Sequence, residues 1–184
     1  MNTLIIAVIA GTTRPLRQSI HAAEYIAQFG RTLPDIEIIE IDPIDFTFNG
    51  DGNDPEGKDP NYTVITERAD AFFIVTPEYN HSFPGSLKRL LDSELQNYNH
   101  KAVALAGVSA GPWGGVRAVE SLVHVVRELG LVVTSSDVYF PGVSGLFEDG
   151  RLKPEYTERY DKSLEKAFSE LVWMARALKA ARST

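Results

Sequence analysis

Short apolar runs alternate along this chain with segments in which apolar residues recur at helical spacing. The runs are four to eight residues long and rich in β-branched and aromatic side chains, which is typical of strands buried in a sheet. One of them, IEIIEI at 36–41, alternates apolar with acidic residues, which indicates a strand nearer the sheet edge. The pattern predicts strands at 4–10, 36–41, 69–75, 101–108 and 131–138, and helices at 19–29, 61–68, 84–96, 115–129 and 154–181.

Regular alternation of five strands with five helices predicts an α/β fold with three layers, in which helices cover both faces of a parallel sheet. Parallel strands need long, right-handed crossovers, which the helices supply. With this number of elements we expect five strands in the flavodoxin-like order 2-1-3-4-5. In that order the chain leaves the first and third strands in opposite directions, which opens a ligand crevice at their carboxyl ends. The chain shows no repeat and no linker, so residues 1–184 are expected to form a single domain.

Composition excludes several classes of protein. The net charge is −7 without a basic block, so a nucleic-acid surface is not expected. No apolar run approaches the roughly 20 residues of a membrane span, and the amino terminus lacks the features of a signal peptide. Cysteine is absent, which excludes disulfides, thiolate nucleophiles and cysteine-bound zinc and is compatible with the cytoplasm, where we expect the protein.

The loop after the third strand carries the most specific pattern in the sequence. Pro77 stops the apolar run at 69–75, because proline has no N–H to donate to a sheet. The polar quartet Glu78-Tyr79-Asn80-His81 follows, and a helix resumes after Pro84. A plain turn does not need this combination of residues, so we expect a ligand-binding loop.

The loop after the first strand, GTTRPLRQS at 11–19, suits a phosphate group. Thr12, Thr13 and Ser19 supply hydroxyl groups. Arg14 supplies a positively charged guanidinium group with several N–H donors, and the next helix offers free N–H groups. Arg17 and Gln18 add further donors. The loop is neither a Walker loop nor a GxGxxG fingerprint. Taken alone, it also fits solvated arginines and a serine that merely caps the helix.

The loop after the fourth strand, SAGPWGG at 109–115, has three glycines, which allow the backbone to approach a flat ligand closely. Residues 107–111 also match GxSxG, the nucleophile elbow of α/β hydrolases. A hydrolase needs a later acid and histidine, but His124 is the only histidine after Ser109 and falls within a predicted helix. We therefore do not expect a hydrolase.

The remaining titratable residues suggest no chemistry of their own. The four histidines show no metal-ligand spacing, and no pair of carboxylates is placed for acid–base work. We therefore expect neither a metal site nor a catalytic side chain, and a bound cofactor is expected to supply the chemistry. The long irregular segment at 42–60 is expected to be functional or mobile.

The three loops GTTRPLRQS, PEYNHSFPGSLKRLLD and SAGPWGG, in this order, resemble the NADPH-dependent FMN reductase family of flavodoxin-like proteins, which includes quinone, azo and chromate reductases. The likeness extends from Leu4 to the turn at 147–151. Three features depart from the usual pattern. Thr12 replaces a common serine and keeps the hydroxyl group. Arg89 replaces an asparagine and Ser93 a common tryptophan, both on the helix that such proteins often use to dimerise. The segment 42–60 is longer than the usual Pro-rich loop and is expected to affect substrate access.

The resemblance implies an FMN-dependent oxidoreductase with ping-pong kinetics, in which hydride passes from NADPH or NADH through FMN to a small acceptor such as a quinone, free flavin, azo compound or metal oxyanion. A homodimer or homotetramer is also implied. The implied FMN-binding residues are Thr12, Arg14, Gln18 and Ser19 at the phosphate, Pro77, Glu78, Tyr79 and Asn80 at the ring edge, and Ser109 and Gly111 at the ribityl and ring side. An electron carrier or flavin-binding regulatory module without NAD(P)H turnover is the alternative, and a phosphate-binding protein without flavin is a third.

Overall fold

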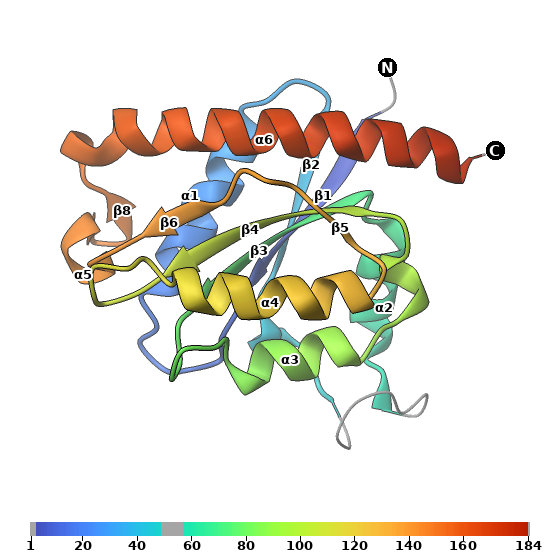
Figure 1. Ribbon diagram of the computed structural model, residues 1–184, viewed down its shortest axis with the longest axis horizontal. Coiled ribbons are helices and arrows are strands. Elements are labelled where there is room, and N and C mark those ends of the chain that lie inside the picture. Colours follow the sequence, from blue (N-terminus) through green and yellow to red (C-terminus); the bar gives the residue numbers. More distant parts are fainter. Residues whose placement is uncertain (1–2, 49–56, 184) are drawn as a thin grey trace.

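A computed structural model describes residues 3–48 and 57–183 of the chain. A central sheet lies between helices on both faces (Figure 1). The main elements are β1 (Leu4–Ala10), α1 (Ser19–Arg31), β2 (Ile36–Ile41), α2 (Pro60–Arg68), β3 (Ala71–Pro77), α3 (Gly85–Asp92), β4 (Ala102–Val108), α4 (Val116–Glu128), β5 (Val132–Val133), β6 (Val138–Phe140), α5 (Val143–Leu146), β7 (Phe147–Glu148), β8 (Arg151–Leu152) and α6 (Pro154–Arg182).

The sheet has the order β2-β1-β3-β4-β5, and all of its pairings are parallel. In the register, Ile6 of β1 lies beside Ile38 of β2 and Ala71 of β3. The predicted flavodoxin-like α/β fold is therefore confirmed. The crevice expected between the carboxyl ends of β1 and β3 follows from this order.

The predicted continuous strand at 131–138 is wrong, because two short strands share the fifth position. β5 pairs with the beginning of β4, and β6 pairs with its end. Between them, Thr134 N still donates to Val103 O at 2.9 Å, but Ser135 N donates to Glu170 Oε1 of α6 at 2.8 Å. The backbone therefore leaves the sheet at Ser135, where the N–H group donates to a side chain of α6 instead of to a carbonyl of β4.

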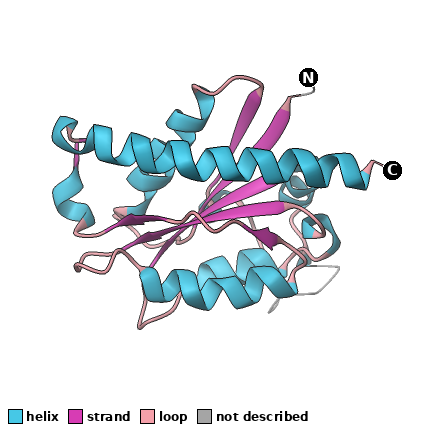
Figure 2. Ribbon diagram, turned by 45° about the horizontal axis from the view of Figure 1, so that its top comes forward, coloured by secondary structure: helices cyan, strands magenta, loops and turns pink. Residues whose placement is uncertain are grey.

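Side chains that alternate along the strands divide the interior into two apolar layers. Val8 and Phe73 point to the layer beneath α1 and α6, whereas Ile9 and Phe72 point to the layer beneath α2, α3 and α4. Figure 2 shows the sheet between these two sets of helices. Residues of β3 and β4 are buried on both faces. This explains why their sequences read as unbroken apolar runs.

Two further elements differ from the predictions. The helix expected to reach residue 96 ends at Asp92, where Ser93 Oγ donates to Leu90 O at 2.6 Å, and a 3₁₀ turn at Gln96–Tyr98 follows. The antiparallel pair β7–β8 was not predicted. Its turn residues Asp149 and Gly150 both have positive φ, as a two-residue hairpin requires.

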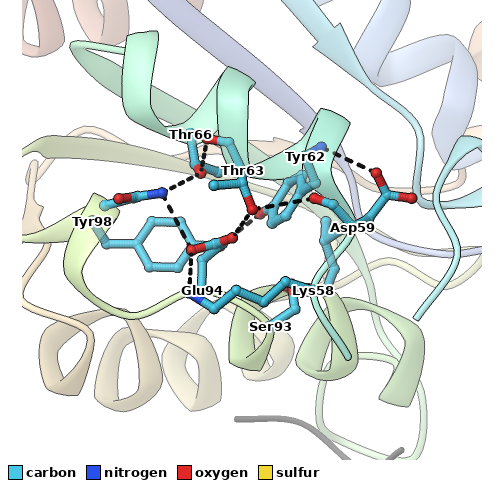
Figure 3. A network of polar contacts seen from close by, with 10 residues as sticks. Lys58, Asp59, Tyr62, Thr63, Thr66, Ser93, Glu94 and Tyr98 are labelled. Atoms are coloured by element: carbon cyan, nitrogen blue, oxygen red, sulfur yellow. Dashed lines mark hydrogen bonds and ion pairs between the residues drawn. The ribbon is translucent and has the colours of Figure 1, made fainter. Parts of the chain in front are cut away.

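A polar network joins α2 to the connection between α3 and β4 (Figure 3). Glu94, which is 2% exposed, accepts hydrogen bonds from Lys58 Nζ at 2.9 Å, from Thr63 Oγ1 and from Asn97 Nδ2 at 3.2 Å. Nearby, the hydroxyl groups of the buried Tyr62 and Tyr98 are 2.6 Å apart. These contacts fix the C-terminal end of the 42–60 segment against the domain.

Aromatic contacts join the start of that segment, residues 46–48, to α2. Phe46 and Phe48 pack edge-on against Tyr62, with ring centroids 5.3 and 6.0 Å away, and Asp59 accepts from Asn61 N to cap α2. Residues 49–56 lie outside the described residues, so the role expected for 42–60 stays a prediction. Among the described helices, none has the length and apolar character needed to cross a membrane.

Candidate functional site

The three loops singled out by the sequence meet at the carboxyl ends of β1, β3 and β4 and form one pocket of about 240 Å³. Four larger grooves, of about 460 to 590 Å³, lie elsewhere on the described surface, and none of them is lined by residues 11–19, 77–82 or 109–115. The pocket is lined by Thr12, Arg14, Leu16, Arg17, Gln18, Ser19, Pro77, Glu78, Tyr79, Val108, Ser109, Ala110 and Val143. Of the ten residues expected to bind a cofactor, the structure brings eight into this lining and leaves out Asn80 and Gly111.

Gly11 lets the first loop leave β1 directly over β3. Its N–H donates to Val75 O at 2.8 Å, and a Cβ added at this position would lie 2.6 Å from the same oxygen. A side chain would therefore displace the start of the loop. The tight exit places the beginning of α1 beside the pocket.

The amino terminus of α1 is open to the pocket. Gln18 is the N-cap residue and makes no capping hydrogen bond with its side chain. Ser19 is the first helical residue and is 5% exposed, so the interpretation of Ser19 as a plain cap is wrong. Free N–H groups and the helix dipole favour an anion here. The exposed Arg14 adds positive charge to the same wall of the pocket.

The sequence predicted that Arg17 adds free hydrogen-bond donors to the pocket, and the structure shows that only part of its guanidinium is free. Its Nη2 forms an ion pair with Asp42, which follows β2, while its Nε is buried and has no partner among the described atoms. Leu16, which the sequence analysis missed, also lines the pocket and is 96% exposed with a φ of +56°. A bulky residue in this backbone region carries strain. No sequence signal distinguishes Leu16 from an ordinary loop leucine.

Glu78 belongs to the second loop and contacts the end of β4 and the side of α4. Its N–H donates to Val108 O at 3.1 Å, which fixes the loop to the end of β4. One carboxylate oxygen, Oε1, is 3.5 Å from Arg117 Nη1 of α4, and the other, Oε2, is buried without a hydrogen-bond partner in the described structure. An unsatisfied carboxylate oxygen at a pocket wall is suited to accept a hydrogen bond from a ligand. Arg117 was not identified from the sequence, because it falls within a regular helical pattern.

The second loop then turns back tightly. Tyr79 N donates to Ser82 O at 2.7 Å, and Ser82 N donates to Tyr79 O at 3.0 Å. The two residues between them, Asn80 and His81, have φ values of +50° and +68°. Asn80 therefore shapes the turn at an exposed tip. Tyr79 OH reaches Thr12 Oγ1 at 3.1 Å, which joins the first two loops.

Two of the three glycines in the third loop are needed because the loop packs closely against neighbouring strands. A Cβ on Gly114 would lie 2.8 Å from the Cβ of Tyr139, and one on Gly115 would lie 2.6 Å from Val108 N. Only Gly111 faces open space, with nothing within 4 Å of an added Cβ. The prediction that all three glycines accommodate a flat ligand is therefore wrong for two of them.

Ser109 lacks the partner that a hydrolase nucleophile needs. Its Oγ donates to Gly111 O at 2.8 Å, and its N–H donates to Phe140 O at 3.1 Å. His124 lies on α4 and lines the groove between α3 and α4 instead of this pocket. Within the described residues, no group of three His, Asp or Glu side chains is placed to hold a metal ion. The pocket offers positive charge, free helix amides and one carboxylate acceptor.

Comparison with known proteins agrees with this arrangement. The model of the family described as NADPH-dependent FMN reductase matches residues 4–145. The chain is 36% identical over 121 residues to an NADPH azoreductase of a Bacillus species, a match that covers 64% of this chain and 65% of that protein. It is 27% identical over 186 residues to a quinone reductase of Pseudomonas putida, which covers 94% and 97%.

Among solved structures, FerB, a flavoenzyme NAD(P)H:(acceptor) oxidoreductase from Paracoccus denitrificans, superposes with a TM-score of 0.73. It covers 95% of this chain and 98% of that one at 20% sequence identity, a level that supports the fold alone. The family match, in contrast, spans most of the chain. The protein therefore belongs to the NADPH-dependent FMN reductase family.

Proposed function

We propose that this protein is an FMN-dependent NAD(P)H oxidoreductase whose cofactor is held by the three loops at the carboxyl ends of β1, β3 and β4. The observation that carries the proposal is the meeting of an open helix terminus, two arginines and an unsatisfied carboxylate oxygen in one pocket. FMN, which has a phosphate at one end and a polar ring edge at the other, needs this combination of groups.

At the phosphate end, the N–H groups at the start of α1 donate to the phosphate, and the Ser19 hydroxyl and Arg14 guanidinium add charge-assisted hydrogen bonds. Thr12 has a supporting role, because its Oγ1 already accepts from Arg14 N at 3.3 Å and contacts Tyr79 OH. Arg17 is paired with Asp42, which offsets its charge, so its remaining contribution is the Nε–H group, which has no partner among the described atoms. Gln18 lies at the N-cap position beside these groups.

At the ring end, residues of the second and third loops orient the flavin. Pro77, Glu78 and Tyr79 line this wall, and the free Oε2 of Glu78 accepts a hydrogen bond from the ring edge. Ser109 borders the opposite side. Gly111 lies outside the pocket lining, and the open space beside it would leave room for a planar group that extends beyond the pocket. Asn80 acts through the turn that positions Tyr79. The pocket, at about 240 Å³, is smaller than typical ligand cavities, so a flavin ring bound here would not be fully enclosed.

When bound, FMN supplies hydride chemistry by accepting hydride from NAD(P)H and reducing a second substrate. The chain orients the two partners and holds the polar edge of the ring, and no side chain is needed as an acid or base. The named relatives act on azo compounds and quinones, and we propose acceptors of this planar, small-molecule class. A homodimer or homotetramer in the cytoplasm completes the proposal.

The test is steady-state NADPH oxidation by the FMN-loaded protein with a quinone acceptor. We expect parallel double-reciprocal lines, as ping-pong turnover requires, and at most modest losses of activity per bound flavin in Ser109→Ala and His81→Ala. A flavin-loaded protein that does not oxidise NADPH or NADH would identify an electron carrier instead. Abolition of activity by Ser109→Ala with FMN fully bound would assign chemistry to Ser109 and contradict the proposal.

A further inference from the structure

Arg117 lies at a position where its own helix disfavours a positive charge. It is the second residue of α4, which begins at Val116 after the N-cap residue Gly115. The amino terminus of a helix carries a partial positive charge, so a cation in the first turn is destabilising. Residues 116–119, which form this turn, include no acid that would compensate. The reason for an arginine here therefore lies outside α4.

The partner of Arg117 is Glu78 in the second loop. Arg117 Nη1 lies 3.5 Å from Glu78 Oε1, which is the long limit of a hydrogen bond. One turn later on the same face of α4, Ser121 Oγ donates to His81 O at 3.4 Å. α3 and α4 lie side by side on one face of the sheet (Figure 1), so α4 borders the loop that leads into α3. α4 thus contacts the second loop at two points, and at one of them it presents a charge.

The carboxylate of Glu78 is only partly compensated by the fold. Its side chain is 13% exposed, whereas that of Arg117 is 46% exposed. Glu78 Oε2 is buried and has no hydrogen-bond partner among the described atoms. A buried carboxylate that lacks partners is costly, and a nearby cation reduces this cost. Arg117 therefore supplies the compensating charge for a carboxylate that the rest of the fold leaves unsatisfied.

This pair sets the charge at one wall of the pocket. Of the described residues that line the pocket, Glu78 is the only acid, and the two basic ones are Arg14 and Arg17. Arg17 is paired with Asp42, and Arg14 belongs to the loop assigned to the phosphate. The charge at the opposite end of the pocket, assigned to the ring, thus depends on Glu78 and on how far Arg117 offsets it.

We propose that Arg117 is a positioning residue that compensates Glu78 and thereby sets the reduction potential of a flavin bound in the pocket. The proposal rests on the proposed function, in which the polar ring edge lies at Glu78. A hydride brings two electrons and one proton to a neutral ring, so the reduced ring carries one more negative charge than the oxidised ring. Nearby charges therefore act differently on the two oxidation states. An uncompensated Glu78 would disfavour the reduced state, and Arg117 offsets this effect.

The first experiment measures the dissociation constants of oxidised FMN and of dithionite-reduced FMN by anaerobic calorimetric titration. A tenfold rise in the ratio of the reduced to the oxidised constant lowers a two-electron potential by about 30 mV. Arg117→Met should raise this ratio about tenfold, because it leaves the charge of Glu78 uncompensated. Glu78→Gln should lower the ratio about tenfold, because it leaves the cation without its carboxylate.

Three further variants separate the effect of charge from that of structure. The double variant Glu78→Gln/Arg117→Met should return the ratio to within about threefold of the wild type, because neither charge remains. Arg117→Lys keeps the charge and should also stay within about threefold. Arg127→Met is the matched control, since it makes the same substitution at an exposed arginine in the last turn of α4. It should leave the ratio unchanged.

The two half-reactions give a second readout. In stopped-flow measurements on Arg117→Met, reduction of the bound flavin by NADPH should become slower, and its reoxidation by a quinone should become faster. A lower potential makes the flavin a weaker oxidant and a stronger reductant, whereas a displaced loop would slow both steps. Slowing of both half-reactions with an unchanged ratio of constants would give Arg117 a structural role alone and overturn the inference.

The outcomes distinguish this inference from the proposed function on which it rests. Equal losses of affinity for oxidised and reduced FMN in Arg117→Met would overturn the inference while FMN binding stands. Shifts of the same sign in Arg117→Met and Glu78→Gln would do the same. A wild type that binds neither form of FMN would overturn both. Circular dichroism of each variant verifies folding.

Discussion

Lys101 is the residue whose charge the fold disfavours most clearly. It is 7% exposed at the start of β4, and its Nζ donates to Thr66 O at 2.7 Å and to Glu67 O at 3.2 Å. Burial lowers the pKa of Lys101 from 10.5 to about 8, and nearby Arg182 lowers it further, whereas Asp70 and Glu67 oppose the shift. The two carbonyls accept from either protonation state, so the amine keeps its partners when neutral.

This pKa predicts a specific pH dependence of stability. Between pH 8 and 10.5 the unfolded chain binds the Lys101 proton while the folded chain releases it, so the free energy of unfolding should rise with pH across this window. Below pH 8 both states are protonated and the contribution is constant. Urea unfolding of wild type and Lys101→Met at several pH values measures the difference. Curves that stay parallel from pH 8 to 10.5 would show that the pKa is not lowered.

At the scale of single residues, the sequence predicted which side chains line the pocket, but it did not predict which partners those side chains pair with. The charges and hydroxyl groups at Arg14, Ser19 and Glu78 were identified because their loops follow buried strands. The pairing of Arg17 with Asp42 depends on how β2 lies beside β1, which local pattern does not encode. The same holds for Glu78 and Arg117, which are 39 positions apart in the chain.

At the scale of elements, the third loop is held against β4 by direct backbone packing. A Cβ on Gly107 would lie 2.5 Å from Gly114 O and 3.0 Å from Gly115 O. Neither carbonyl can move without shifting the start of α4. Gly107→Ala should therefore lower the free energy of unfolding by about 1–3 kcal/mol, as overpacking commonly does.

Gly111→Ala is the matched control for this prediction. It lies in the same region of the chain and has nothing within 4 Å of an added Cβ, so its stability should change by less than about 0.5 kcal/mol. Its FMN affinity should fall if the ring packs against this backbone. Thermal melts and FMN titrations separate the two effects. Equal stability losses in the two variants would contradict the packing described.

The network around Glu94 predicts a second effect at this scale. Glu94→Gln keeps the side-chain shape but replaces charge-assisted hydrogen bonds from Lys58 with neutral ones, so the free energy of unfolding should fall by about 1–3 kcal/mol. Glu40→Gln, in the exposed ion pair with Arg31, should change it by less than about 0.5 kcal/mol. Chemical denaturation compares the two. Equal effects would mean that Glu94 contributes no more than a surface charge.

The predicted helices and strands are correct where an apolar run is long. They are wrong where hydrogen bonds made by a side chain set the end of an element. The four long strands and the helices between them follow directly from periodicity. The fifth strand is interrupted at Ser135, whose N–H donates to Glu170, a residue 35 positions away in the chain. α3 ends where the N–H and hydroxyl groups of Ser93 both donate to Leu90 O, although the leucine pattern predicted that the helix continues.

At the scale of the whole molecule, topology explains why one pocket gathers three distant loops. β1 and β3 are neighbours in the sheet, and β4 is next to β3, so loops around residues 11–19, 77–82 and 109–115 emerge side by side. The pocket therefore depends on the sheet order rather than on any single motif.

If these three loops bind FMN through its phosphate, a fluorescence titration of the apoprotein should detect it. We expect one FMN per chain, much weaker binding of riboflavin, and FMN affinity reduced about 10- to 150-fold in Arg14→Ala, equivalent to about 1.5–3 kcal/mol. Arg31→Ala, at the far end of α1, is the control and should bind FMN like wild type. Equal affinity for FMN and riboflavin, or unchanged FMN binding in Arg14→Ala, would show that the loops do not hold the phosphate.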